Sequence, residues 1–479
     1  MKRVAVIGGG FGGLAAAAEL AHAGHRVTLF EKSNTLGGKA QVVTGDGLTL
    51  DTGPTLLTMP DVVRALFARI GASDLLPKFT RLSLQARYTW KHDARVFECH
   101  EDLERTVASA AQFGPKEAGG ARSFFAEAER LFAAAGGPYL EAPFENMPEF
   151  LARVIKHVGP LGMLTGMKLS TLDGLATSHF HSPQLRQFVN RFATYAGCSP
   201  YLATAAFALI PHLERAQGVH HVEGGMAALV KALGLALERL GVELRLGEEV
   251  RWTNQRVVAD QQFDSVIVNA DPFAHEPLGT RPLALSGYVA LLDVKRRLPL
   301  AHHHVVFGGD YVREFDELFA KHTVPSDPTV YFCHPAATDP TVAPEGRSGL
   351  FAMVNAPAMR RAEDVDAWKQ QHAAAMRQHC LDALKQLVPG LRDDEVTLLA
   401  ERTPVELAQR GAPGGSIYGF LPHGPFGPFQ RPKIKSTTPG VFFAGGSTHP
   451  GGGVPMVLLS GHFAATMAST FLGSARAAA

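Results

Sequence analysis

A glycine-rich turn near the N-terminus constrains the fold more than any other feature of this sequence. Gly8, Gly10 and Gly13 form a G-x-G-x-x-G pattern. The pattern follows an apolar run at residues 4–7 and precedes an Ala-rich stretch at 14–23. In such a unit the first glycine permits a tight turn, the second admits a pyrophosphate, and the third lets helix and strand pack closely. We therefore predict a strand, a turn and a helix whose N-terminus binds a dinucleotide.

An acidic residue closes the second strand of this unit. Residues 27–30 are a second apolar run, and Glu31 follows it directly. A carboxylate at this position accepts hydrogen bonds from ribose hydroxyls and disfavours a 2′-phosphate, so we do not expect NADP. A glycine turn with no ligand is the alternative, but strand, turn, helix, strand and acid in this order favour a cofactor.

Three further segments favour FAD over NAD. A second glycine pair ends at Gly38 and is followed by Lys39, a cation suited to the phosphates. Gly53 and Pro54 lie in another turn where the backbone is expected to approach the cofactor. Near the C-terminus a glycine-rich loop joins a strand at 440–444 to a helix beginning at 454, and the N-terminus of that helix would stabilise negative charge on a reduced flavin. The predicted cofactor contacts are Gly8, Gly10, Phe11, Gly13, Glu31, Lys32, Gly38, Lys39, Gly53, Pro54, Thr55, Val250, Asn269, Gly445, Gly446, Val454, Pro455 and Met456.

The predicted fold class is α/β, with a Rossmann-like, glutathione-reductase-type FAD domain and an inserted α+β substrate domain with a helical, membrane-facing part. Residues 1–75, 215–275 and 430–479 are assigned to the FAD domain, and 76–214 and 276–429 to the substrate domain. Residues 60–215 look mostly helical. Elsewhere we expect strands at 264–269, 283–292, 329–333 and 350–354, and helices at 226–240 and 364–387.

Charge and cysteine usage exclude several classes of function. The 46 basic and 45 acidic side chains give a net charge of +1, which argues against a nucleic-acid partner. The four cysteines are far apart and form no C-x-x-C pair, so we expect four buried thiols in a reducing compartment. The N-terminal apolar run is too short for a signal peptide, and no uninterrupted apolar stretch is long enough to span a membrane. We therefore expect a cytoplasmic protein.

Several motifs resemble bacterial phytoene-desaturase-type carotenoid oxidoreductases along essentially the whole chain. They are the N-terminal glycine pattern, residues 37–40, residues 51–54 and residues 447–455. Residues 191–200 and 221–226 are more similar to the hydroxyneurosporene and methoxyneurosporene branch, the 1-hydroxycarotenoid 3,4-desaturases. The resemblance implies non-covalent FAD, a lipophilic acyclic carotenoid whose C3–C4 bond becomes double, and oxygen or a quinone as electron acceptor. It also implies hydride transfer to the flavin and loss of a proton to a base.

Other classes remain open beside this resemblance. Another carotenoid or retinoid oxidoreductase or isomerase shares the cofactor residues. A flavin amine oxidase is disfavoured because Gly446 stands where such enzymes often have an acid. Flavin-less, prenyl-binding escort proteins resemble the fold, although the intact glycine turn and Glu31 argue against them. No cysteine follows Cys380, which excludes a flavin thioether in the C-terminal segment.

Two residues are candidates for the proton acceptor. His449 lies in the loop expected near the flavin, and Glu223 precedes the helix expected at 226. A loop histidine that hydrogen-bonds the backbone and a glutamate that caps a helix are the structural alternatives, and we favour them. Tyr195, Tyr201 and Tyr418 either line a substrate tunnel or, as we favour, belong to the core.

We expect no metal site. His302, His303 and His304 are adjacent, but neighbouring side chains of a strand point to opposite faces and cannot all bind one ion. We interpret them as a solvated strand end or turn.

A basic amphipathic pattern predicts contact with the membrane surface. Apolar residues recur at helical spacing over 150–158, with Arg153, Lys156 and His157 between them, and an apolar stretch follows at 161–169. A helix packed on the core is the alternative. We favour peripheral attachment to the cytoplasmic membrane, because a polyene substrate dissolves in lipid and not in water.

Overall fold

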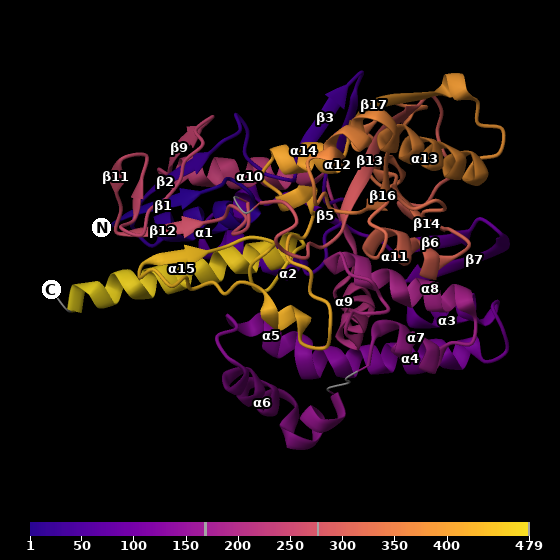
Figure 1. The fold of residues 1–479 in the computed structure, drawn as a ribbon, viewed down its shortest axis with the longest axis horizontal. Helices are drawn as coiled ribbons and strands as arrows, with labels where there is room; N and C mark the ends of the chain where they lie inside the picture. The colour runs from indigo at the N-terminus through magenta and orange to yellow at the C-terminus, as the bar shows by residue number, and fades with distance from the viewer. Residues whose placement is uncertain (167–169, 275–276, 478–479) are drawn as a thin grey trace.

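The computed structural model describes residues 1–166, 170–274 and 277–477. The chain forms two large β-sheets (Figure 1). The first sheet has five parallel strands in the order β18-β12-β1-β2-β9. Its strands are β1 (Arg3–Ile7), β2 (Arg26–Glu31), β9 (Glu243–Leu246), β12 (Ser265–Val268) and β18 (Val441–Phe443). Because β1 lies in the middle and is buried on both faces, it reads as a continuous apolar run.

Helices from distant parts of the chain cover this sheet. They are α1 (Phe11–His22), α2 (Pro60–Arg69), α10 (Met226–Arg239) and α15 (Val454–Ala477). Helices α1 and α15 pack so closely that a Cβ on Gly461 would lie 2.2 Å from the carbonyl oxygen of Gly12. Over Val454–Gly473, α15 is long and apolar enough to cross a membrane. Its buried Leu458 and Ala464 belong to the core beneath α1, so we interpret α15 as a core helix.

The second sheet has seven strands in the order β17-β13-β16-β15-β14-β6-β7. Its strands are β6 (Leu84–Trp90), β7 (Asp93–His100), β13 (Ser286–Val294), β14 (His303–Phe307), β15 (Val330–Cys333), β16 (Ser348–Ala356) and β17 (Val396–Arg402). All neighbours are antiparallel except β14 and β6. Strands that precede β9 in the sequence (β6 and β7) and strands that follow β12 (β13 to β17) thus form one sheet.

The structure corrects several expected elements. Strands β6 and β7 lie within 60–215, which was predicted to be mostly helical, and β14 and β17 were not predicted. The helix expected at 364–387 is two helices, α12 (Glu363–Ala367) and α13 (Ala373–Leu387), joined by a π-helical turn. The strand expected at 283–292 begins at Ser286 and extends to Val294.

The remaining elements form a helical layer and three small ribbons. The helices are α3 (Leu103–Ala111), α4 (Glu117–Leu131), α5 (Gly137–Glu141), α6 (Met147–Gly166), α7 (Leu172–His179), α8 (Pro183–Asn190), α9 (Leu209–Gln217), α11 (Tyr311–Phe319) and α14 (Pro404–Gln409). The ribbons pair β3 (Val42–Gly45) with β4 (Leu48–Asp51), β5 (Phe79–Arg81) with β8 (His220–Val222), and β10 (Val257–Val258) with β11 (Gln261–Gln262). Helix α6 lies at the lower edge in Figure 1 and is kinked at Gly159, which has φ +73° and precedes Pro160.

Candidate active site

One cavity of about 970 Å³ brings the two ends of the chain together. The N-terminal glycine turn, the second glycine pair, the turn at 52–55 and the C-terminal loop all line it. Every predicted cofactor contact lines this cavity except Gly13. Gly13 is not part of the cavity lining, and a Cβ on Gly13 would lie 2.0 Å from the carbonyl oxygen of Gly8. Its lack of a side chain is therefore needed for helix–strand packing.

The N-terminus of α1 is built to receive an anion. Gly10 is the N-cap and supplies no side-chain acceptor, and the first turn contains no acidic residue. The backbone N–H groups of that turn are consequently available to a phosphate, with the positive end of the helix dipole behind them. Gly38 packs so near that a Cβ there would be 3.2 Å from Cα of Gly10. Side chains at either position would fill the space beside the turn.

Glu31 is held by the backbone on both sides. Oε2 accepts a hydrogen bond of 2.7 Å from the N–H of Gly9, and Oε1 accepts one of 2.8 Å from the N–H of Ser33. The side chain lines the cavity although its residue is only 7% exposed. Each carboxylate oxygen keeps a further lone pair for a ribose hydroxyl.

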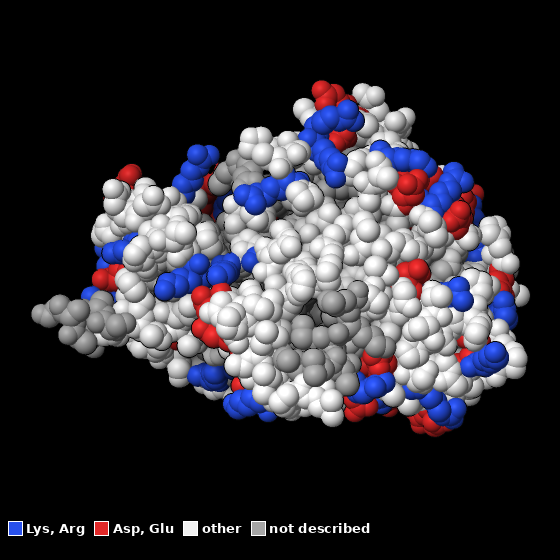
Figure 2. All heavy atoms as spheres, turned by 60° about the horizontal axis from the view of Figure 1, so that its bottom comes forward, with Lys and Arg blue, Asp and Glu red and all other residues white. Residues whose placement is uncertain are grey.

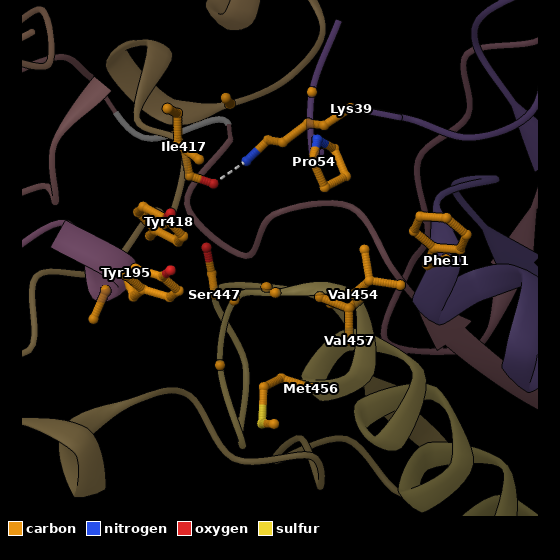
Figure 3. Close-up of a pocket in the computed structure, with 18 of the residues that line it drawn as sticks. Phe11, Lys39, Pro54, Tyr195, Ile417, Tyr418, Ser447, Val454, Met456 and Val457 are labelled. Atoms are coloured by element: carbon orange, nitrogen blue, oxygen red, sulfur yellow. Dashed lines mark hydrogen bonds between the residues drawn. The ribbon is translucent and has the colours of Figure 1, made fainter. Parts of the chain in front are cut away.

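Polar and charged side chains lie near the C-terminal loop, and Figure 3 shows Lys39 and Ser447 among them. Lys39 Nζ donates a hydrogen bond of 2.5 Å to the carbonyl of Ile417, which ties the second glycine segment to the chain before the loop. Ser447 Oγ donates to Asp271, and burial raises the pKa of that carboxyl. Arg431 Nη1 donates a hydrogen bond of 3.1 Å to the carbonyl of Gly446. Sequence reasoning missed Asp271 and Arg431, because neither belongs to a glycine motif.

A second part of the cavity is mostly apolar. It extends between the helical layer and the second sheet, where its wall includes Leu131, Ala134, Phe207, Ile210, Leu213, Val305 and Phe351. Phe150 of α6 also lines it. Phe426 lines it too and is 47% exposed, which places it where the cavity reaches solvent.

Arg191 and Tyr195 form one of the polar parts of this wall. Arg191 and Tyr195 line the cavity, and Tyr195 Oη donates a hydrogen bond of 2.6 Å to Glu214 Oε1. Burial raises the pKa of Glu214. The Arg191 guanidinium lies 5.3 Å from the ring centroid of Tyr195 and 5.9 Å from that of Tyr331. Of the three tyrosines assigned to the core, Tyr195 and Tyr418 instead line the cavity.

The described cavity wall includes neither candidate proton acceptor. His449 does not line the cavity: its ring is buried among aromatic side chains, with its centroid 4.5 Å from that of Tyr139, and burial lowers its pKa to about 3. Glu223 lies on the surface, where Oε1 is 2.6 Å from Lys78 Nζ. A residue's distance from the glycine loop along the chain does not reveal which way its side chain points.

The interpretation of the three histidines as a solvated strand end is also wrong. His302, His303 and His304 are 5%, 2% and 3% exposed. Burial lowers the pKa of both His303 and His304 to about 3, so these rings are neutral. The expectation for the four cysteines is confirmed, since all are buried and free.

Comparison with known proteins identifies the family. The family model for flavin containing amine oxidoreductases matches residues 11–468. The chain belongs to this family. A member of this family carries a flavin, and the cavity described above fits one, with an uncapped helix N-terminus for phosphate and a buried carboxylate for ribose.

Among relatives of this flavin oxidoreductase, carotenoid desaturases are prominent. It is 34% identical to hydroxyneurosporene desaturase of Rubrivivax gelatinosus, over 98% of this chain and 94% of the relative. It is 28% identical to 1-hydroxycarotenoid 3,4-desaturase of Flavobacterium sp., over 98% and 99%. The predicted resemblance to this branch is thereby confirmed.

Solved structures support the fold of this family member. Cyclohexylamine oxidase from Brevibacterium oxydans has a TM-score of 0.63 at 15% identity, over 98% of this chain and 99% of that chain. An oxidoreductase from Methanosarcina mazei has a TM-score of 0.62 at 17% identity, over 96% and 99%. At these identities the likeness concerns the fold alone.

Proposed function

We propose that this protein is an FAD-dependent desaturase that adds a C3–C4 double bond to an acyclic, 1-hydroxylated or 1-methoxylated carotenoid. The observation that carries the proposal is that one continuous cavity runs from the N-terminal glycine turn to an apolar wall. The carotenoid desaturases among its relatives support the substrate class.

Bound FAD would supply a two-electron acceptor beside the substrate. The chain's own residues would hold it: the N–H groups of α1 at the phosphates, Glu31 at a ribose, and the N-terminus of α15 at the ring. Among the lining residues that the structure describes there is neither cysteine nor histidine, the usual points of covalent attachment. This supports non-covalent binding. Oxygen or a quinone is the proposed electron acceptor.

The apolar wall would orient the polyene and exclude water. A long conjugated chain offers few polar groups, so burial of apolar surface supplies most of the binding free energy. Arg191 is suited to a terminal hydroxyl or methoxyl oxygen, because its guanidinium is a hydrogen-bond donor in the cavity wall.

We assign the proton to the pair formed by Tyr195 and Glu214. Tyr195 lines the cavity and its Oη is hydrogen-bonded to the Glu214 carboxylate, so a proton accepted at Oη would pass to Glu214 as the phenolic proton moves along the 2.6 Å hydrogen bond. Burial raises the pKa of Glu214, which brings it nearer to the range of an effective general base.

Helix α6 is proposed to attach the protein to a membrane surface. Phe150 and Val154 point into the core, whereas Ile155 is 41% and Leu161 74% exposed. The end of the molecule that carries α6 faces the viewer in Figure 2, and charged side chains lie mainly around its margin. Phe150 also lines the cavity, so a carotenoid leaving the bilayer would enter near α6. Of the apolar stretch predicted at 161–169, residues 167–169 lie outside the described part of the chain.

The product of the reaction tests the proposal. Cells that make acyclic 1-hydroxycarotenoids would express the protein, and the pigments would be analysed by absorbance and mass. A product that has lost two hydrogen atoms and absorbs at longer wavelength is expected. An isomer of unchanged mass would indicate an isomerase. An oxygenated product would favour the second candidate, an oxygenase, since 4,4'-diapolycopene oxygenase of Methylomonas sp. is 32% identical over 96% of each chain.

A further inference from the structure

Two histidines and a cysteine meet behind the cavity wall. Strands β14 and β15 are antiparallel, and His303 lies directly opposite Cys333 in their register. His302 precedes β14 by one residue. One ring nitrogen from each histidine and Sγ of Cys333 all lie within 4.8 Å of one another. His302, His303 and Cys333 are 5%, 2% and 2% exposed.

The alternation of side chains along a strand does not place His302 and His303 on opposite faces of the sheet. His302 lies outside the strand, and its carbonyl accepts a hydrogen bond of 2.7 Å from the N–H of His334. Its ring can therefore lie beside that of His303, with a centroid distance of 4.6 Å. His304 follows the alternation: its Nε2 lies 3.1 Å from Thr89 Oγ1 on the strand beyond.

In the rings of His302 and His303, one nitrogen takes part in a hydrogen bond and the other does not. His302 Nδ1 lies 2.8 Å from Thr338 Oγ1, and His303 Nδ1 lies 2.8 Å from Tyr331 Oη. In the described part of the chain neither Nε2 has a hydrogen-bond partner, although both atoms are buried. A buried polar atom without a partner costs about 1–3 kcal/mol, so a ligand is expected to satisfy it. Outer hydrogen bonds of this kind orient metal-binding histidines.

We propose that His302, His303 and Cys333 bind a zinc ion. Two imidazole nitrogens and one thiolate are a ligand set that Zn²⁺ accepts, with a fourth position open to water. Binding forms a Zn–S bond while the thiol proton is released to solvent, and no electron is transferred. Zn–N bonds of about 2.0–2.1 Å and a Zn–S bond of about 2.3 Å are the distances expected in the loaded site.

The zinc site adjoins the wall of the cavity. Tyr331 Oη connects His303 to Thr55 Oγ1, which lies 2.7 Å from it, and both Tyr331 and Thr55 line the cavity. The ion would hold the start of β14 against β15 and fix the tyrosine through His303. It is thus a structural ion, and no part of hydride or proton transfer depends on it.

Metal analysis of the full-length, flavin-loaded protein tests this proposal. After growth with zinc and dialysis, we expect about one zinc per chain, and added zinc should raise the melting temperature. Cobalt in place of zinc should give a thiolate-to-metal charge-transfer band in difference spectra. Cys333→Ser and His302→Asn should each lower the retained zinc at least tenfold.

Two neighbours provide matched controls. Cys380→Ser changes another buried thiol, on α13, and His304→Asn changes the adjacent histidine on the opposite face. Both should retain zinc. The proposal is overturned if the wild-type protein binds neither zinc nor cobalt when titrated with each, or if Cys333→Ser and His302→Asn hold as much zinc as the controls. Because wild-type binding is measured directly, misfolding of a variant does not decide the result. Metal content is also independent of whether any carotenoid is converted, so this test and that of the proposed function fail separately.

Discussion

The N–H of Gly9 donates a hydrogen bond of 2.7 Å to Oε2 of Glu31, and this bond links the glycine turn to the end of β2. The same carboxylate accepts from Ser33, so it holds both the turn before α1 and the chain after β2. Glu31 therefore shapes the glycine turn, and we propose that it also presents oxygen atoms to a ribose.

Replacing Glu31 by glutamine should weaken flavin binding. The amide keeps the shape but turns an NH₂ group towards one of the two N–H donors, which costs about 1–3 kcal/mol for an unsatisfied buried group. We expect the dissociation constant for FAD to rise about 10- to 100-fold, measured by flavin fluorescence. Arg26→Gln, at the exposed start of the same strand, is the control and should change affinity less than Glu31→Gln, because Arg26 is absent from the described cavity wall. Equal effects of the two substitutions would contradict the assignment.

Removing the Tyr195 hydroxyl should slow desaturation without loss of flavin. Tyr195→Phe and Glu214→Gln each break the proposed proton path, and a general base contributes on the order of 10²–10⁴-fold to a rate. We expect kcat to fall at least tenfold in each, with flavin content and KM little changed. Tyr201→Phe is the control, because Tyr201 is absent from the described cavity wall. Full activity in Tyr195→Phe would remove this pair from the mechanism.

Glu314 should make stability depend on pH. Burial raises its pKa from 4.5 to about 7, and its Oε2 accepts a hydrogen bond of 2.7 Å from Thr329 Oγ1. Below pH 4.5 the group is protonated in both states. As the pH rises from 4.5 to 7, the unfolded state ionises first, and the free energy of unfolding falls by on the order of 3 kcal/mol. Glu314→Gln should lack this component, as chemical denaturation at several pH values would detect; parallel pH profiles for the two proteins would contradict it.

The contact between α1 and α15 should be sensitive to one methyl group. Gly461→Ala would place Cβ 2.2 Å from the Gly12 carbonyl oxygen, so the helices must separate, and we expect destabilisation of about 2 kcal/mol. Gly473→Ala, on the same helix, meets no atom within 4 Å and should be neutral or stabilising by up to about 1 kcal/mol. Thermal unfolding compares the two variants. If Gly461→Ala were as stable as Gly473→Ala, the close packing would be refuted.

The exposed apolar side chains of α6 should mediate membrane binding. Replacing Ile155 and Leu161 together by serine removes two large exposed apolar side chains of α6, and we expect at least a tenfold loss of binding in liposome sedimentation. Val312→Ser, at an exposed apolar position on α11, is the control and should bind normally. Liposome binding that is unchanged by the double substitution would assign attachment to another surface.

Local motifs predicted which glycine segments line the cavity, because each motif carries its own geometry. A Cβ on Gly8 or Gly38 would lie 3.2–3.3 Å from backbone atoms, and such glycine patterns are visible within a few residues. The seven-stranded sheet was harder to predict, since β6 and β7 carry polar side chains and β6 pairs with β14, some two hundred residues away. The alternation of apolar and polar residues in these two strands extends over only a few positions, whereas the helical segments around them are long.

The other differences between the sequence predictions and the structure arise from the direction of side chains and from the pairing of strands that are distant in the sequence. His449 is next to the cavity-lining Pro450, yet its ring turns into an aromatic cluster. Glu214 reaches the site only through Tyr195, and Cys333 meets His303 only through the pairing of β14 with β15. None of these relationships has a signal within one segment of the sequence.

The most direct test of the account is a single turnover without oxygen. The purified protein, with its flavin quantified, would be mixed anaerobically with an acyclic 1-hydroxycarotenoid in liposomes and no other electron acceptor. We predict one molecule of the product with two fewer hydrogen atoms for each bound FAD, and none from protein stripped of flavin. Product formed by the stripped protein, or none formed by the flavin-loaded protein, would contradict the claim that one cavity joins FAD to the carotenoid.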